Sequence, residues 1–208
     1  MKLRFRILPA LVALCLPAGG FAQMIASFTP ASPGLVALPS ATTFSGQTFT
    51  AEFSATVGVV TVLAQSVGAG PTAVTFQLRS VSGGLPTSAI LGAVTRPGTT
   101  LTSSLSAFSV DFASQGIFLN SGESYALTLF GSSMFGLGGV PNGYAGGAQV
   151  IGNTPTDTFF FFAPARDLSF SVAAAPLVAV PEPSTYSAMG AMALVGICAW
   201  SRIRRRKA

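Results

Sequence analysis

The stretch Ser124-Tyr125-Ala126-Leu127-Thr128-Leu129 alternates large apolar residues with small or polar ones, and this alternation decides the fold class. Successive side chains of a β-strand point to opposite faces, so the large apolar residues of this stretch are expected on one buried face. The same two-residue period recurs four more times, which predicts several half-buried strands. The other sets expected to face the core are Phe49/Ala51/Phe53, Val74/Phe76/Leu78, Phe108/Val110/Phe112 and Leu168/Phe170/Val172.

Two further segments, residues 56–63 and 158–162, are more uniformly apolar. Such runs are candidates for central strands that are covered on both faces. Clusters of Gly, Pro, Asn and Ser separate the strands and predict turns, and neither a helical pattern nor a fixed-period repeat is present. The predicted turns are residues 68–71, 82–86, 96–100 and 120–122. The sequence therefore predicts an all-β domain over residues 23–179, a single jelly-roll-like β-sandwich.

The N-terminal residues 1–22 have the three parts of a secretory signal peptide: a basic start, an apolar run over residues 7–16, and small residues before the expected cleavage between Ala22 and Gln23. The apolar run is too short to span a bilayer, which disfavours an N-terminal anchor helix. Both cysteines of the chain lie outside the middle domain, so the exported domain is expected to contain no disulfide.

The C-terminal residues 180–208 begin with Pro181-Glu182-Pro183, whose prolines predict an extended segment. An apolar run follows and predicts one transmembrane helix over about residues 185–201. The basic residues of the tail 202–208 are expected to stay in the cytoplasm, which places the middle domain outside. These basic residues are Arg202, Arg204, Arg205, Arg206 and Lys207.

The order of these C-terminal features resembles the PEP-CTERM sorting signal, in which a Pro-Glu-Pro motif precedes a short apolar helix and an arginine-rich end. Tyr186 stands where this family more often has Trp, and it keeps the aromatic character. The resemblance implies that an exosortase in the inner membrane processes the chain near Pro181, Glu182 and Pro183. It also implies an origin in Gram-negative bacteria that make exopolysaccharide.

The middle domain resembles the extracellular β-sandwich domains called choice-anchor domains, which precede surface-sorting tags. The resemblance covers residues 44–172 and implies no established catalytic residues. The phrases that carry it, in order, are residues 45–51, 82–86 leading to 91–92, 119–127, 144–147 and 167–170.

Charge and residue types exclude most catalytic and nucleic-acid functions. Residues 23–184 contain three basic and six acidic residues, a net charge of −3, which disfavours binding to phosphate backbones. The chain has no histidine, and the middle domain has no cysteine, so His-dependent triads and His or Cys metal sites are absent. We expect no cofactor and no catalytic residues.

Three residues are candidates for contact with a ligand or a metal ion. Asp157 and Asp167 flank the last predicted loop and could bind Ca²⁺, although two solvated turn acids are the simpler interpretation. Tyr144 lies in the glycine-rich stretch 136–147, which is either a flexible loop or a platform for stacking a sugar ring.

Together these features predict a non-enzymatic protein of the bacterial surface or extracellular matrix. Its expected partners are the secretion machinery, an exosortase and the membrane, with exopolysaccharide as a candidate ligand. It is expected to be anchored in the inner membrane before processing and to reach the envelope exterior or matrix afterwards. Two alternatives stay open, a carbohydrate-binding module and a glycoside hydrolase that uses two carboxylates.

Overall fold

The computed structural model describes residues 23–154, 156–162 and 165–176. The chain divides into two compact units, Met1–Pro176 and Leu177–Ala208. The predicted signal peptide, the sorting motif at Pro181, Glu182 and Pro183, the anchor helix and the basic tail lie outside the described residues. Within the described residues, the structure contains no helix with the length and apolar character needed to cross a membrane.

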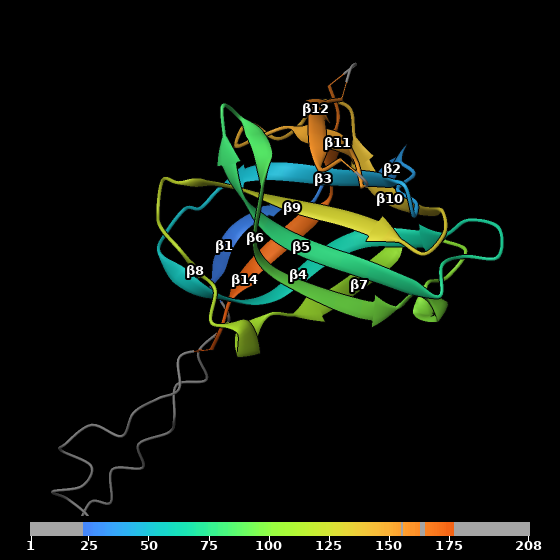
Figure 1. Cartoon of the computed structure of the whole chain (residues 1–208), viewed down its shortest axis with the longest axis horizontal. Helices are drawn as coiled ribbons and strands as arrows, with labels where there is room; N and C mark the ends of the chain where they lie inside the picture. The colour runs from blue at the N-terminus through green and yellow to red at the C-terminus, as the bar shows by residue number, and fades with distance from the viewer. Residues whose placement is uncertain (1–22, 155, 163–164, 177–208) are drawn as a thin grey trace, which may run out of the picture. The chain divides into compact units, whose positions relative to one another are not determined.

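The described residues form two antiparallel sheets, which confirms the prediction of an all-β, sandwich-like domain (Figure 1). The jelly-roll order of the strands stays a prediction. One sheet has eight strands: β1 (Met24–Phe28), β14 (Phe170–Ala174), β4 (Ala55–Ser66), β10 (Phe135–Val140) and β13 (Asp167–Leu168) in order, with β2 (Gly34–Ala37) on β10, and β7 (Ser106–Asp111) and β8 (Phe118–Leu119) on β4. The other has six, in the order β12 (Thr158–Phe161), β11 (Gln149–Asn153), β3 (Thr43–Thr50), β9 (Ser124–Gly131), β5 (Ala73–Ser82) and β6 (Leu85–Pro97).

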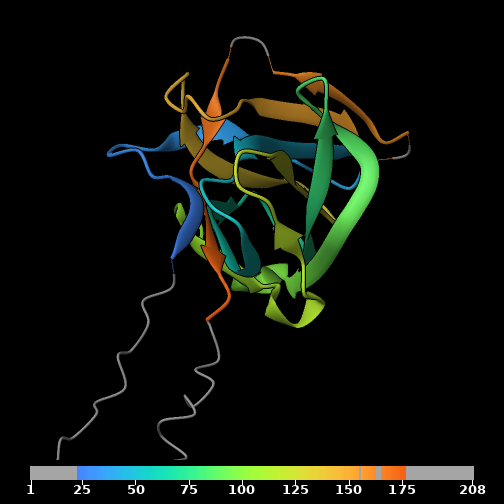
Figure 2. The same cartoon turned by 90° about the vertical axis from the view of Figure 1, so that its left-hand side faces the viewer.

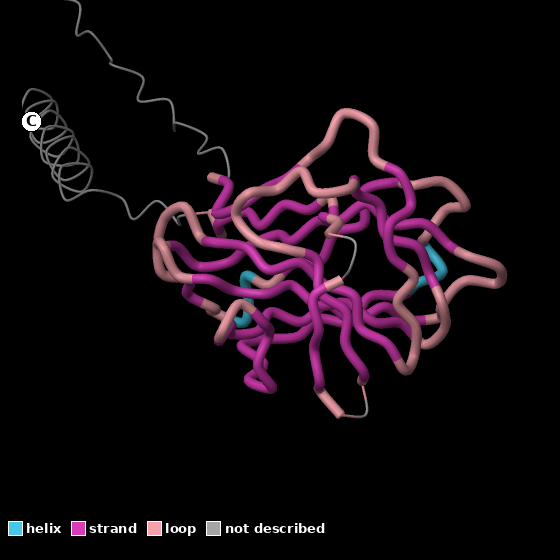
Figure 3. The backbone as a smooth tube through the Cα atoms, turned by 90° about the horizontal axis from the view of Figure 1, so that it is seen from above, coloured by secondary structure: helices cyan, strands magenta, loops and turns pink. Residues whose placement is uncertain are grey.

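Strands and loops make up nearly all of the described chain (Figure 3). The helical residues in this part of the chain form two short 3₁₀ turns, Gly98–Thr100 and Ala113–Gln115. The core lies between the two sheets. It contains the apolar sets that the two-residue period predicted, with Phe53 half-buried at its margin and the other members buried. The predicted turns at residues 68–71, 82–86 and 120–122 also separate strands as expected, with glycines at positive φ in each.

Two strands of the six-stranded sheet, β5 and β9, have buried residues on both faces. The sequence predicted that only one face of each would be buried. Thr128 of β9 and Arg79 of β5 were expected on solvent-facing sides but are fully buried. The reason is that this sheet is curved: β12 at one edge contacts β6 at the other edge. Side chains of β3 and β12 then cover the outer face of β5 and β9, so a second small cluster forms outside the main core.

The prediction of two central strands was half right. β4 is central, because it pairs with β14, β7, β8 and β10, although Val59 remains exposed on its outer side. The segment 158–162 is not central: β12 forms an edge of the six-stranded sheet and pairs with β11. Its run of phenylalanines buries Phe159 and leaves Phe160 and Phe161 more than half exposed.

The glycine-rich stretch 136–147 is not a single loop, because its first part is the buried strand β10. Glycine is needed where β10 lies tightly between its neighbours. A Cβ atom on Gly139 would lie 1.9 Å from the backbone oxygen of Asp167. The sequence showed many glycines there but not the close neighbours that require them.

Both ends of the described domain lie at the same edge. β1 and β14 pair in antiparallel orientation, with Met24 opposite Ala173, so the first and last strands are neighbours (Figure 2). β11 and β12 lie on the side of the domain away from this edge in both Figure 1 and Figure 2.

A matched pair of glycine substitutions tests the packing of β10. Gly139→Ala should lower the free energy of unfolding by about 1–3 kcal/mol, because the new methyl group meets backbone that cannot move aside cheaply. Gly34 is the cross-strand partner of Gly139, and a Cβ added there meets no atom within 4 Å. Gly34→Ala should therefore change the free energy of unfolding by less than about 1 kcal/mol. Urea unfolding followed by circular dichroism measures both, and equal effects would contradict the packing of β10 against β13.

Candidate functional site

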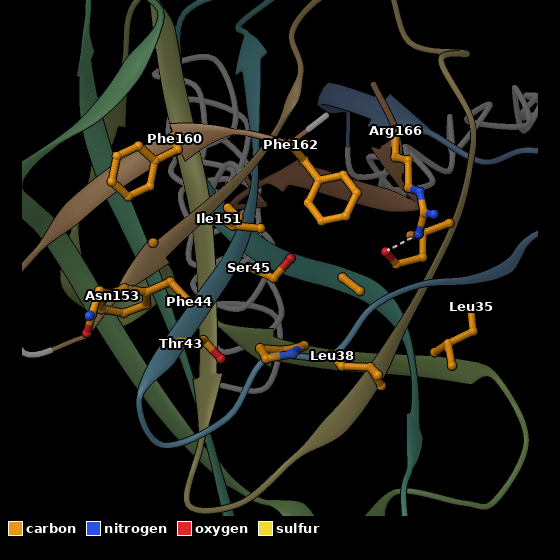
Figure 4. Close-up of a pocket in the computed structure, with 14 residues that line it drawn as sticks. Leu35, Leu38, Thr43, Phe44, Ser45, Ile151, Asn153, Phe160, Phe162 and Arg166 are labelled. Carbon is orange, nitrogen blue, oxygen red and sulfur yellow. Dashed lines mark hydrogen bonds between the residues drawn. The ribbon is translucent and has the colours of Figure 1, made fainter. Parts of the chain in front are cut away.

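An apolar cleft of about 500 Å³ opens between β2 of one sheet and β11 and β12 of the other (Figure 4). It continues the space between the sheets: Ile151 lies on the same face of β11 as Gln149, whose side-chain amide contacts Ser45 inside the sandwich. Four large apolar side chains at the cleft are partly exposed, namely Leu35, Leu38, Ile151 and Phe160. The sequence analysis did not predict this cleft, because the walls of the cleft come from segments that are separated along the chain.

Arg166 provides the positive charge of the cleft. Its Nη1 donates a hydrogen bond of 3.0 Å to the backbone oxygen of Val36, and its guanidinium lies 5.0 Å from the centroid of the Phe162 ring. The close-up shows Arg166 at one end of the cleft and Phe160 at the other (Figure 4). In the described part of the chain the one ion pair joins Arg79 to Asp157, so no described carboxylate neutralises Arg166.

The cleft offers little acid–base chemistry. Its described lining residues include no acidic side chain, and its polar side chains apart from Arg166 are Thr43, Ser45 and Asn153. General acid–base catalysis of the glycosidase type needs two facing carboxylates. The arrangement is suited to binding an apolar molecule rather than to proton transfer.

Asp167, a weak Ca²⁺ candidate, is held inside the fold by three N–H donors. Its Oδ1 accepts a 3.0 Å hydrogen bond from Nε2 of Gln47, and its Oδ2 accepts bonds from the backbone N–H groups of Gly143 (2.7 Å) and Tyr144 (2.9 Å). The residue is only 2% exposed, so the interpretation as a solvated turn acid is wrong for Asp167. The three donors satisfy both oxygens of this buried carboxylate within the fold.

Asp157 has a different partner. Its Oδ1 accepts a 2.9 Å bond from Nη2 of Arg79 in the cluster on the outer face of the six-stranded sheet. Asp157 is 39% exposed, while Arg79 is 1% exposed. No group of three His, Cys, Asp or Glu side chains that could hold a metal ion forms among the described residues. A Ca²⁺ site at Asp157 and Asp167 stays an untested prediction, which the separate partners of the two acids disfavour.

Arg79 is the most deeply buried charge of the outer cluster, and the sequence did not single it out. Its guanidinium lies 5.1 Å from the ring centroids of both Phe44 and Phe159. Oε1 of Gln77 accepts bonds from its Nε (3.0 Å) and Nη2 (2.7 Å), and the backbone oxygen of Thr87 accepts from Nη1 at 3.1 Å. The cluster thereby joins β12 to β5 and fixes the strand that forms one wall of the cleft.

Tyr144 lies at the margin of the core rather than on an open surface. Its ring packs edge-on against Phe170, with centroids 5.2 Å apart, and at a tilt against Phe28, with centroids 5.6 Å apart. Burial raises the pKa of its hydroxyl, and the nearby negative charges of Glu52 and Asp167 add to this, while a hydrogen bond with the Thr50 backbone opposes it. Contact with a ligand stays a prediction, but two rings already occupy the surroundings of this side chain.

The remaining described acids lie outside the cleft. Asp111 accepts a 2.8 Å hydrogen bond from the backbone N–H of Ala113, the first residue of a 3₁₀ turn. Asp111, Glu52 and Glu123 are all exposed.

Removing the charge of Arg79 tests the outer cluster. Arg79→Met should lower the free energy of unfolding by about 2–3 kcal/mol. The substitution removes both arginine donors from the buried Gln77 oxygen and breaks the ion pair with Asp157. The partial exposure of Asp157 limits the loss. Arg96→Met is the matched control, because Arg96 is half-buried and stacks on one ring, that of Phe108. It should cost about 1 kcal/mol or less. A loss as large as that of Arg79→Met would contradict the assigned role of Arg79.

The raised pKa of Tyr144 predicts a loss of stability at high pH. A tyrosine whose pKa is higher in the folded state holds its proton more tightly there, so its contribution is full below the unfolded pKa of about 10 and is lost as the pH rises above it. The free energy of unfolding of the wild type should therefore fall more steeply between pH 9 and 11 than that of Tyr144→Phe. Parallel slopes for the two proteins would overturn this assignment.

Comparison with known proteins concerns the C-terminal unit. A search of curated protein sequences found no match to the chain. Residues 179–207 match the family model of the PEP-CTERM protein-sorting motif. This confirms the resemblance seen around Pro181, Glu182 and Pro183. The motif implies that the chain is an exported protein that exosortase processes and that is anchored in the membrane or at the cell surface.

Proposed function

We propose that the chain is a non-enzymatic protein of the bacterial surface or extracellular matrix. A signal peptide cleaved between Ala22 and Gln23 directs export, and the helix at about residues 185–201 holds the chain in the inner membrane. Exosortase then cleaves near Pro181–Pro183 and releases the domain to the envelope exterior or the matrix. The observation that carries this proposal is the PEP-CTERM match at residues 179–207, which begins a few residues after the last strand of the sandwich.

The arrangement of the domain is compatible with both cuts. Since β1 and β14 are neighbours, the described domain begins and ends at one edge. Cutting at Ala22 leaves β1 complete, because this strand begins at Met24. Cutting near Pro181 leaves β14 complete, because this strand ends at Ala174. Neither processing step therefore removes a strand from the sheets.

We also propose that the domain is of the choice-anchor type. Two packed antiparallel sheets support this, as do the positions of two phrases that carry the resemblance. Residues 82–86 form the β5–β6 turn, with Gly83 and Gly84 at positive φ, and Gly122 has positive φ in the turn before β9. Both phrases thus supply glycine where the backbone needs it.

The two rival functions have less support. A carbohydrate-binding module on the predicted platform needs an open aromatic face, whereas Tyr144 packs on Phe28 and Phe170. A glycoside hydrolase needs two facing carboxylates at a substrate site. The described lining of the cleft contains no acid, and Asp157 and Asp167 are each engaged with donors of the fold. We therefore propose no catalytic activity and no resident cofactor.

Mass spectrometry of the mature protein from wild-type and exosortase-deficient cells tests the proposed processing. In the wild type, the N-terminal residue should be Gln23 and the C-terminus should lie close to residues 181–183. In exosortase-deficient cells, the peptides containing Arg202 and Arg204 should remain attached and the protein should stay in the membrane fraction.

Two glutamate variants sharpen this test. Glu182→Ala should cause retention of the tail, whereas Glu123→Ala, the same change at an exposed position of the domain, should be processed normally. Unprocessed chains recovered from the cytosol of wild-type cells would overturn the proposal.

A further inference from the structure

We propose that the cleft between β2 and β11–β12 binds an amphipathic molecule with an elongated apolar body and one anionic group, such as a fatty-acid-type carboxylate. This inference is independent of the sorting tag, because it rests on the described domain alone. It names a ligand site that the proposed surface function does not require.

The apolar part of the ligand is inferred from the cleft walls. Leu35, Leu38 and Phe160 are each close to half exposed or more, and Ile151 is over a third exposed. These side chains converge on one cleft of about 500 Å³, which is within the usual size range of small-molecule sites. Exposed apolar side chains that gather in this way, unlike scattered ones, mark binding surfaces.

The anionic group is inferred from Arg166. The described residues contain three arginines and five acids (Glu52, Asp111, Glu123, Asp157 and Asp167), so the domain is acidic overall. Arg79 is used by its pair with Asp157, and Arg96 donates to the backbone oxygen of Ser109. Arg166 is the arginine that lines the cleft, and its stacking on Phe162 and its bond to Val36 hold the guanidinium at that end in advance.

The lining favours an acyl-type body over a sugar. A sugar ring carries a hydroxyl on most of its carbons, and burying these without partners costs free energy. The described lining offers three polar side chains besides Arg166, those of Thr43, Ser45 and Asn153. A hydrocarbon chain needs none of these partners along its length.

The test uses two fluorescent probes with the same aromatic frame. 1-Anilinonaphthalene-8-sulfonate is amphipathic and anionic, and N-phenyl-1-naphthylamine lacks the sulfonate. The full chain is held in nanodiscs of zwitterionic lipid, and empty nanodiscs give the background. Both probes should bind above this background, the anionic probe more tightly, and dodecanoate should displace it.

Variants of the cleft separate the charge from the apolar walls. Arg166→Gln should weaken binding of the anionic probe about tenfold, a typical effect of losing a charge-assisted hydrogen bond, and change binding of the neutral probe less than about twofold. Phe160→Ser should weaken both probes several-fold. Phe118→Ser is its matched control, because Phe118 lies on β8 outside the cleft and is 57% exposed, as Phe160 is.

A second pair of variants, at Ile151, remains informative if Arg166→Gln disturbs the loop that carries Arg166. Ile151→Asp and Ile151→Asn place side chains of nearly equal size in the cleft, and only the first is charged. Asp should weaken binding of the anionic probe at least about threefold more than Asn does, because it repels the anion, and the neutral probe should not distinguish the two variants.

Four results would each overturn the proposal. They are probe binding no stronger than to empty nanodiscs, equal losses for Phe118→Ser and Phe160→Ser, and equal binding of the anionic probe by the two Ile151 variants. The fourth is displacement of the anionic probe by alginate but not by dodecanoate, which would make the cleft a polysaccharide site. A cleft covered by a second copy of the chain would give the first result together with a dimeric mass.

Discussion

The buried carboxylate of Asp167 is the constraint on which the arrangement of the sheets depends. Asp167 is the first residue of β13 in the eight-stranded sheet, and Gln47 of β3 in the six-stranded sheet donates to its carboxylate and accepts from the N–H of Leu168. A buried anion without partners is very costly, so its three N–H donors must all be in place when the core closes. One residue thereby fixes the distance between the sheets, the loop at Gly143 and the start of β13.

The same constraint positions the cleft. Arg166 directly precedes Asp167, and its backbone oxygen accepts a 3.1 Å bond from the N–H of Gln149 at the start of β11. The bond from Gln149 and the donors to Asp167 therefore hold the backbone from which the side chain of Arg166 reaches toward β2 and over Phe162. On the opposite wall, the Arg79 cluster holds Phe159, so the neighbouring Phe160 points into the cleft from a strand that is anchored rather than free.

The sequence predicted what depends on local order. The period of Val74, Phe76 and Leu78 placed one face of β5 in the core, and the motif at Pro181–Pro183 predicted the sorting tag from contiguous residues. It could not predict that Gln77 and Arg79 are buried, since that depends on β12 folding over a strand nearly eighty residues earlier. The prediction of a central strand at residues 158–162 was wrong because it also depends on contacts between distant segments. The apolar composition of this run indicates burial, but β12 pairs with β11 alone and is therefore an edge strand.

The edge strand β12 exposes apolar side chains, and this exposure bears on function. An edge strand that presents apolar side chains invites pairing with other chains, and proteins usually protect such edges with charge, proline or cover. Here the described domain has no disulfide to offset a weakened core, and β12 nevertheless exposes Phe160 beside Ile151, Leu35 and Leu38. Replacing these side chains by polar ones would cost the main core little, because they lie at its open end. Their convergence on one cleft beside Arg166 supports the proposed ligand site.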